Sequence, residues 1–322
     1  MSLKQKVLEA AHSTGLAAAT RRATAGQLRI LAYHGLWVTP GHQFGNRLFM
    51  SPGQFEARMK RLRRSGLPVL RLGEAVELLA DGGLPDAAVV ITIDDGWVST
   101  FTHMLPVLEA EGLPATVYAT TWYSGRDLPV VDVATTYLIE ASGRKDLDRS
   151  AKVAEIEALP ADRRLDALRR FGSELGVDQA WLELGQFNLM SLDQLAKAAC
   201  RGIDVQLHTH RHIDVSEQVD ALPGEIAENR AFLAQVSGGS LDHFCYPSGT
   251  FHPRAPDLLA SSGVRSATLV EEGLNRPGAN PYRLRRFLDG RSVSDAEFDA
   301  YLNGVLHFLR PLRALLPGSG SE

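Results

Sequence analysis

The sequence predicts an α/β fold in which parallel strands alternate with helices, with a barrel favoured over an open sheet. Short apolar runs alternate with helical patterns, which is typical of parallel βαβ units. About seven runs resemble strands, and that number favours a barrel. They occupy residues 28–32, 68–70, 88–93, 115–118, 203–207, 243–246 and 264–268.

Two helices between these runs have recognisable starts. Ser51 is a predicted N-cap, Pro52 stands at the first helical position, and Gly66 ends the pattern. Ser191 opens a second helix over LDQLAKAACRG. Both helices fit crossover connections between parallel strands.

The stretch from about 128 to 190 interrupts the alternation. It contains no clear strand and consists of charged helical sequence, in which one stripe holds Leu165, Leu168, Phe171 and Leu175. We therefore predict a helical insertion in the barrel. Packing on the outside of the barrel is the favoured interpretation, and a lid over the site is the alternative.

The insertion falls inside a predicted barrel domain of residues 28–292. A helical segment, 1–27, is expected before this domain, and a helix with a tail, 293–322, after it.

Composition excludes several classes of protein. The 322 residues carry a formal charge of -4, so there is no global bias toward nucleic acid. Two cysteines are too few for a disulfide scaffold and fit a reducing compartment. No apolar segment approaches the roughly 18 residues of a membrane span, and the charged first residues do not resemble a secretory signal. We therefore expect a cytoplasmic protein.

Basic residues near both ends suggest a second hypothesis, peripheral contact with the inner face of the membrane. The residues concerned are Lys4, Lys6, Arg21, Arg22 and Arg29 in the first 29 positions, and Arg310 and Arg313 in a leucine-rich segment. Helices packed on the outside of the barrel are the favoured interpretation of the same segments.

Two adjacent carboxylates follow the apolar run that ends at Ile93. A strand buried on both faces does not tolerate ionised groups in its interior, but its C-terminal end is where α/β folds bind ligands. One aspartate suffices to cap a following helix. The pair Asp94 and Asp95 therefore indicates a functional site, and Gly96 lets the backbone turn sharply after it.

Three histidines, His208, His210 and His212, directly follow another strand. His208 and His212 converge on one point if a turn follows. With Asp95 they form a set of one carboxylate and two imidazoles, and three protein ligands with an open position are typical of a catalytic zinc ion or a related divalent ion. We therefore predict a divalent metal, Zn²⁺ first, with Co²⁺ or Ni²⁺ as alternatives. His210 is expected nearby or at the surface.

Two further stretches are expected at the end of the barrel where the aspartates and histidines lie. His34 follows the first strand, and CYPSG, residues 245–249, follows a later one. In a parallel barrel the C-terminal ends of all strands face one side. His34 and the backbone amides of 247–249 are therefore expected beside the carboxylates.

Together these stretches resemble the polysaccharide deacetylases, carbohydrate esterase family 4, with their NodB-homology domain. TIDDG (92–96) is similar to the Thr-Phe-Asp-Asp-Gly motif of that family, HTHRH (208–212) to its His-Ser/Thr-x-x-His motif, and CYPSG to its Arg-x-Pro-Tyr-Gly motif. The early pair Tyr33-His34 resembles the subgroup whose acid histidine lies near the N-terminus. The resemblance spans roughly 28–288 without the insertion, and it implies a distorted (β/α)7 barrel.

The resemblance also implies roles for single residues. Asp94 would be the general base and His34 the general acid. The metal ligands would be Asp95, His208 and His212. The backbone amide of Ser248, which stands in place of the motif's tyrosine, would bind the oxyanion. Substrate contacts are expected from Tyr246, Pro247 and Arg286.

One departure from the family pattern concerns the base. Cys245 stands where the motif has an arginine, and in the family that arginine orients the base. Arg283, Arg285 and Arg286 are candidates to replace it.

The predicted function is metal-dependent removal of an N-acetyl group from an amino sugar in a glycan or glycan precursor, whether nucleotide-linked or lipid-linked. Three alternatives stay open: the same fold acting on a non-sugar amide, a saccharide-binding module with a decayed site, and a cysteine hydrolase based on Cys245. No nucleic-acid partner is expected, and the sequence leaves the oligomeric state open.

Overall fold

The computed structural model describes residues 15–41, 43–44 and 49–313, with side chains up to residue 309. Its centre is a sheet of seven parallel strands in the order β8-β7-β6-β5-β4-β1-β9. The strands are β1 (Arg29–Tyr33), β4 (Val89–Ile93), β5 (Thr116–Ala119), β6 (Asp204–Leu207), β7 (His243–Cys245), β8 (Ser266–Thr268) and β9 (Phe287–Leu288). A separate two-stranded sheet joins β2 (Gly35–Leu36) to β3 (Phe49–Met50).

The segment from 284 to 288 reaches both edges of the curled sheet. Leu284 forms a parallel bridge with Thr268 of β8, and its amide donates to the Ala267 carbonyl at 2.9 Å. Four residues later, Leu288 pairs with Ala32 of β1. The expected distorted (β/α)7 barrel is therefore confirmed.

One of the seven strand predictions, that for residues 68–70, is wrong. Residues 68–70 contribute only a single bridge, from Val69 to Val89, and the seventh strand is β9. A strand of two residues is too short for its apolar pattern to be recognised.

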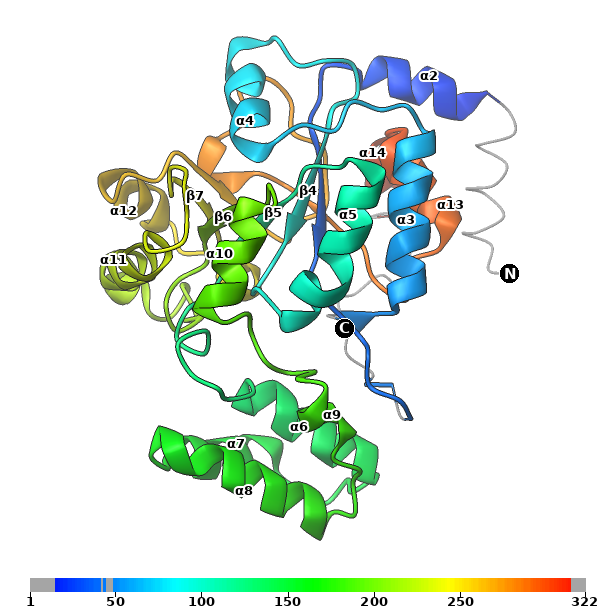
Figure 1. Ribbon diagram of the computed structural model, residues 1–322. Coiled ribbons are helices and arrows are strands. Elements are labelled where there is room, and N and C mark those ends of the chain that lie inside the picture. The colour runs from blue at the N-terminus through cyan, green and yellow to red at the C-terminus, as the bar shows by residue number, and fades with distance from the viewer. Residues whose placement is uncertain (1–14, 42, 45–48, 314–322) are drawn as a thin grey trace.

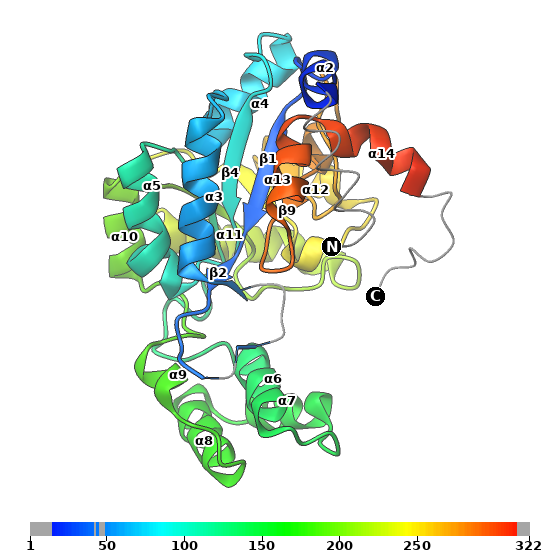
Figure 2. The same cartoon turned by 90° about the vertical axis from the view of Figure 1, so that its right-hand side faces the viewer.

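Helices surround the sheet and also form a separate group beyond one of its ends (Figures 1 and 2). The surrounding helices are α2 (Leu16–Ala23), α3 (Pro52–Arg64), α4 (Leu72–Asp81), α5 (Leu105–Glu111), α10 (Leu192–Cys200), α11 (Leu222–Leu233), α12 (Ala255–Ser261), α13 (Asp295–Leu302) and α14 (Val305–Arg313). The separate group is α6 (Val131–Ser142), α7 (Arg149–Glu157), α8 (Ala161–Glu174) and α9 (Ala180–Glu183).

Both predicted helix starts are present. The Ser51 hydroxyl accepts a hydrogen bond from the Gln54 amide at 3.1 Å. Ser191 and Gln194 form a capping box at the start of α10. Each cap satisfies amides that the first helical turn leaves without a partner.

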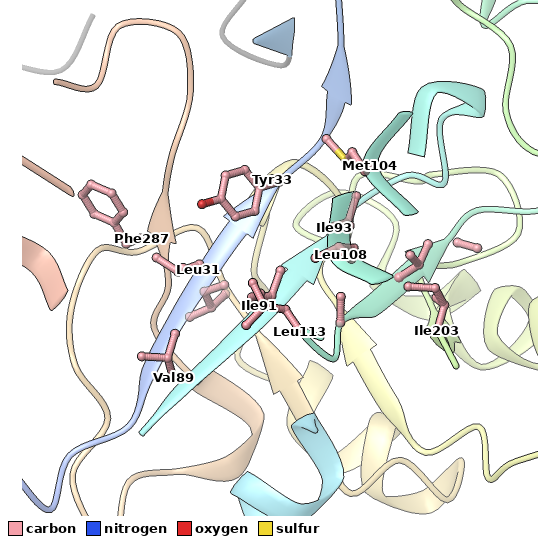
Figure 3. Close-up of a cluster of buried hydrophobic side chains, with 14 of the residues drawn as sticks. Leu31, Tyr33, Val89, Ile91, Ile93, Met104, Leu108, Leu113, Ile203 and Phe287 are labelled. Atoms are coloured by element: carbon pink, nitrogen blue, oxygen red, sulfur yellow. The ribbon is translucent and has the colours of Figure 1, made fainter. Parts of the chain in front are cut away.

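The core consists of layers on both sides of the strands. Figure 3 shows Leu31, Tyr33, Ile91 and Ile93 of β1 and β4 in one cluster with Met104 and other residues from surrounding elements. The alternate strand positions, such as Ile30 and Val90, pack instead with Leu72 and Leu79 of α4. Burial on both faces explains why these strands appear as continuous apolar runs in the sequence.

The predicted insertion is helical, and it joins the barrel through aromatic side chains. The shared cluster contains Trp37, Phe44 and Trp97 from barrel loops and Phe49 from β3, with Tyr137, Trp181 and Phe187 from the insertion. Of the predicted stripe on α8, Leu168 and Phe171 are buried in the same cluster. The insertion is thus anchored to the barrel by a second hydrophobic core.

Arg29 is a structural residue, which corrects its place in the membrane hypothesis. Its side chain is fully buried and donates to the Leu302 carbonyl at 2.6 Å and to the Gln27 carbonyl at 2.7 Å. Lys4 and Lys6 lie outside the described residues, as do the side chains of Arg310 and Arg313. In the described ranges, no helix combines the length and the apolar character that a membrane crossing requires.

Candidate active site

The sequence-predicted site residues meet where β1, β4, β6 and β7 end. His34 follows β1, and Asp94 and Asp95 follow β4. His208 and His212 follow β6, and Ser248 lies in the turn after β7. All of these residues line one cavity of about 490 Å³.

Asp95 and two imidazoles form a compact donor set. Asp95 Oδ1 lies 3.1 Å from His208 Nε2 and 3.5 Å from His212 Nε2. The ligand atoms of the three residues all lie within 4.8 Å of one another. Burial opposes ionisation of Asp95, but hydrogen bonds from the two imidazoles, when their Nε2 atoms carry protons, hold the pKa of this carboxyl well below its usual range.

The chemistry of this donor set fits a divalent cation. The second ring nitrogen of His208, Nδ1, lies 2.8 Å from the Cys245 carbonyl, which can only accept a hydrogen bond. In the neutral imidazole this leaves a lone pair on Nε2, directed at the carboxylate. Two electron-rich atoms facing each other, one of them fixed by a backbone carbonyl, are typical of zinc ligation.

The backbone at the site is unusual. Of the described residues other than glycine, five have positive φ, and four of them lie here: Asp95 (70°), Thr209 (61°), His212 (57°) and Ser248 (53°). Such conformations cost free energy and persist where the surrounding structure enforces them, which is common at functional sites.

Asp94 is held by an arginine from the far end of the chain. Arg286 donates from Nη1 to Asp94 Oδ1 and from Nη2 to Oδ2, both at 2.7 Å. Burial raises the pKa of Asp94, but the charge and hydrogen bonds of Arg286 outweigh it and lower the pKa below its usual value. Two roles were predicted for Arg286: contact with the substrate, and replacement of the motif arginine that is absent at Cys245. Its side chain is fully buried against Asp94, which favours the second role.

Cys245 lies beside this pair rather than in the cavity lining. Its Sγ is 3.2 Å from Arg286 Nη2 and 3.6 Å from Asp94 Oδ2. Burial raises the pKa of this thiol well above its usual value. A buried, protonated thiol is a poor nucleophile, so the cysteine-hydrolase alternative loses its support.

His34 faces Asp94 from the end of β1, the strand that pairs with β4. Its Nε2 lies 3.7 Å from Asp94 Oδ2, and only 11% of its side chain is exposed. Burial lowers the pKa of His34, although Asp94 and Asp95 act in the opposite direction.

The insertion forms one wall of the cavity. Its lining residues include Val130, Asp132, Val133, Thr136, Arg149 and Glu157. The favoured interpretation, that the insertion packs only on the outside of the barrel, is therefore wrong. Arg149 binds Asp132 and donates from Nε to Thr136 Oγ1 at 2.6 Å, which joins α6 to α7 along this wall.

The other predicted residues lie in different surroundings. Tyr246 is buried and lines the cavity, whereas Pro247 is buried and is not among the lining residues. His210 points to Thr121, with Nδ1 2.8 Å from Oγ1, and takes no part in the donor set.

Sequence reasoning missed two residues that support the donor set. The Trp97 indole N–H donates to Asp95 Oδ2 at 2.8 Å. Asn229 of α11 accepts from the His208 amide at 3.0 Å. The position of Trp97, two residues after Asp95, was the one available signal, since Asn229 is remote in sequence.

Comparison with known proteins agrees with this geometry. The family model for polysaccharide deacetylases matches residues 81–267. YxkH of Bacillus subtilis, a protein named after this family, is 20% identical over 281 residues, which cover 87% of this chain and 77% of YxkH.

Two solved structures share the fold. The deacetylase PplD of Streptococcus pyogenes, determined with acetate, has a TM-score of 0.61 at 17% identity and covers 88% of this chain and 98% of its own. IcaB of Ammonifex degensii has a TM-score of 0.59 at 20% identity and covers 86% and 97%.

Proposed function

Because the chain belongs to the polysaccharide deacetylase family, we propose that it is a metal-dependent hydrolase that removes an N-acetyl group from an amino sugar. The observation that carries the proposal is the meeting of two units in one cavity. One is the donor set of Asp95, His208 and His212, and the other is the pair of Asp94 with Arg286.

Asp95 would hold the metal through Oδ1, and His208 and His212 through Nε2. When bound, a divalent cation supplies a Lewis acid that polarises the acetyl carbonyl and makes water easier to deprotonate. His208 is held in the required tautomer by the Cys245 carbonyl.

Asp94 would accept the proton of the attacking water. Its lowered pKa keeps the carboxylate ionised near neutral pH, and two N–H donors of Arg286 fix its plane. A positioned base of this kind contributes roughly 10²–10⁴-fold to a hydrolysis rate.

His34 would donate a proton to the leaving amine. By lowering the pKa, burial makes the imidazolium a stronger acid but lowers its protonated fraction near neutral pH, whereas the charges of Asp94 and Asp95 favour the protonated form. His34 Nε2 lies 3.7 Å from Asp94 Oδ2, so the proposed acid and the proposed base would act close together.

The Ser248 amide would stabilise the oxyanion. Gly249 has φ of +69°, and a Cβ there would lie 2.2 Å from Val270 Cγ2, so the turn that presents this amide requires glycine. One such donor contributes about 3 kcal/mol to the transition state.

Acetate release, with and without a chelator, tests the proposal. The panel contains free, nucleotide-linked and lipid-linked N-acetyl sugars together with a simple non-sugar amide. We expect release from at least one saccharide, loss with chelator and recovery with Zn²⁺. Release that is insensitive to chelator contradicts metal dependence, and release from the non-sugar amide alone contradicts the sugar assignment.

The alternative of a decayed saccharide-binding module rested on the missing motif arginine. Arg286 provides a guanidinium at Asp94, which removes that reason. Saccharide binding without acetate release in metal-loaded protein would nevertheless establish the alternative.

A further inference from the structure

We propose that Trp97 is a positioning residue for the metal centre, because its indole N–H fixes one oxygen of Asp95 so that the other faces the two imidazoles. The inference rests on the proposed function, since it takes Asp95, His208 and His212 as the metal ligands. It also assigns the insertion a second task besides forming a cavity wall.

The two oxygens of Asp95 have different partners. Oδ2 accepts from Trp97 Nε1 at 2.8 Å, whereas Oδ1 faces His208 at 3.1 Å and His212 at 3.5 Å. Trp97 is 2% exposed, so its hydrogen bond is protected from competing water. An indole N–H only donates, and donation to a buried carboxylate is a strong, short interaction. The indole therefore determines which oxygen is left for the cation.

The indole is held in place by the insertion. The Trp97 ring meets Phe49 edge to face at 5.1 Å, and Phe49 meets Phe187 of the insertion at 5.9 Å. Phe187 in turn packs against Trp181 of α9 at 5.6 Å. The aromatic cluster thus connects insertion helices to a hydrogen bond on a metal ligand.

Backbone hydrogen bonds also connect the insertion to the loop that carries Asp95 and Trp97. The Met190 amide donates to the Gly96 carbonyl at 2.8 Å, and the Val98 amide donates to the Asn188 carbonyl at 2.9 Å. The end of the insertion therefore pairs with the loop that carries Asp95. Because Asp95 has a positive φ of 70°, this loop needs such external support.

Zinc affinity of two variants tests the proposal. Trp97→Phe removes the N–H and keeps an aromatic ring, and we expect zinc binding to weaken roughly 10–100-fold, as is usual when a hydrogen-bond partner of a ligand is lost. Trp181→Phe is the matched control. It is the same substitution in the same cluster, and in the described part of the chain the Trp181 indole N–H has no partner. In competition with a chromophoric chelator, the control is expected to bind zinc more tightly than Trp97→Phe, because it keeps the indole N–H on Asp95.

The outcomes separate this inference from the proposed function. Wild-type affinity in Trp97→Phe, or an equal loss in both variants, overturns the role of the hydrogen bond. A wild-type protein that binds no zinc overturns the proposed function instead. If Trp97→Phe does not fold, Phe49→Leu takes its place, because it loosens the support of the indole and keeps the N–H. Its affinity must then fall below that of Trp181→Phe, and an unchanged value overturns the proposal.

Discussion

Asp94, the proposed base, is held by a partner 192 positions away in sequence. Arg286 lies just before β9, and it occupies the space beside Cys245 where the family motif would place its arginine. The guanidinium thus reaches Asp94 from the residue before β9, and β1 lies between β4 and β9 in the sheet. Both partners of this charge pair are buried.

Asp94→Asn removes the base and leaves the donor set intact. We expect acetate release to fall by roughly 10²–10⁴-fold while zinc still binds. His212→Ala, the comparison variant, is expected to lose both activity and zinc. Near-normal acetate release from Asp94→Asn would contradict the assignment of the base.

Arg286→Ala tests the replacement of the motif arginine. Without the guanidinium, the strongest influence that lowers the pKa of Asp94 is lost, so this pKa rises and the acidic limb of kcat/KM moves to higher pH. Adding Cys245→Arg returns an arginine to the motif position. The double variant is expected to regain activity and the wild-type acidic limb, measured as the pH profile of acetate release. A single variant with an unchanged profile would exclude this role for Arg286.

At the scale of the element, the insertion forms one wall of the candidate active site. The helices α6 and α7 contribute a polar wall in which Arg149 binds Asp132, opposite the barrel residues that carry the proposed chemistry. In the proposed function, this wall would contact sugar units beyond the acetyl group. The boundaries given for the barrel and the terminal segments stay predictions.

Arg149→Met should therefore affect saccharide binding more than chemistry. We expect KM for an N-acetylated oligosaccharide to rise about tenfold with little change in kcat, as for an interaction that binds substrate and transition state equally. Unfolding free energy should change by less than about 1 kcal/mol, because the ion pair is half exposed. Arg144→Met is the control, since Arg144 pairs with Asp146 at the same exposure of 52% and does not line the cavity. Equal KM effects in both variants would exclude a specific contact.

At the scale of the whole molecule, buried ionic contacts join distant parts of the chain around the barrel. Asp289, just after β9, accepts from Arg58 Nε of α3 and from the Tyr33 hydroxyl of β1, both at 3.0 Å. Arg58 also binds Asp295 at the start of α13. Elements from both halves of the sequence are thus connected at one buried carboxyl.

This carboxyl predicts a pH dependence of stability. Burial raises the pKa of Asp289 to about 6, although Arg58 and Tyr33 oppose the rise. Between about pH 4 and pH 6 the folded state keeps a proton that the unfolded chain has released, so this contribution to stability is present at low pH and lost as pH rises through 6. The loss is about 3 kcal/mol for a shift of about two pKa units.

Urea unfolding of the wild type and of Asp289→Asn across pH 4 to 7 measures the contribution of Asp289 to the unfolding free energy. We expect the difference in unfolding free energy, wild type minus variant, to decrease with rising pH. A difference that is constant over this range would show that Asp289 does not titrate there.

The sequence by itself determined the motifs, most strands, the helix caps and the residues that surround the candidate metal. These features are local: carboxylates after a buried strand, histidines four positions apart and serine caps reflect periodicity and backbone chemistry within a few residues. Their catalytic and metal-binding roles stay predictions, as does the cytoplasmic location.

Only the tertiary structure decided which arginine meets Asp94, that Trp97 binds Asp95, and that the insertion forms a wall of the cavity. It also showed that β9, not residues 68–70, is the seventh strand, and that Arg29 is buried. The physical reason is common to all of these. Each depends on packing between segments that are far apart in the chain. The local spacing of residues does not determine which of these segments come into contact in the folded barrel.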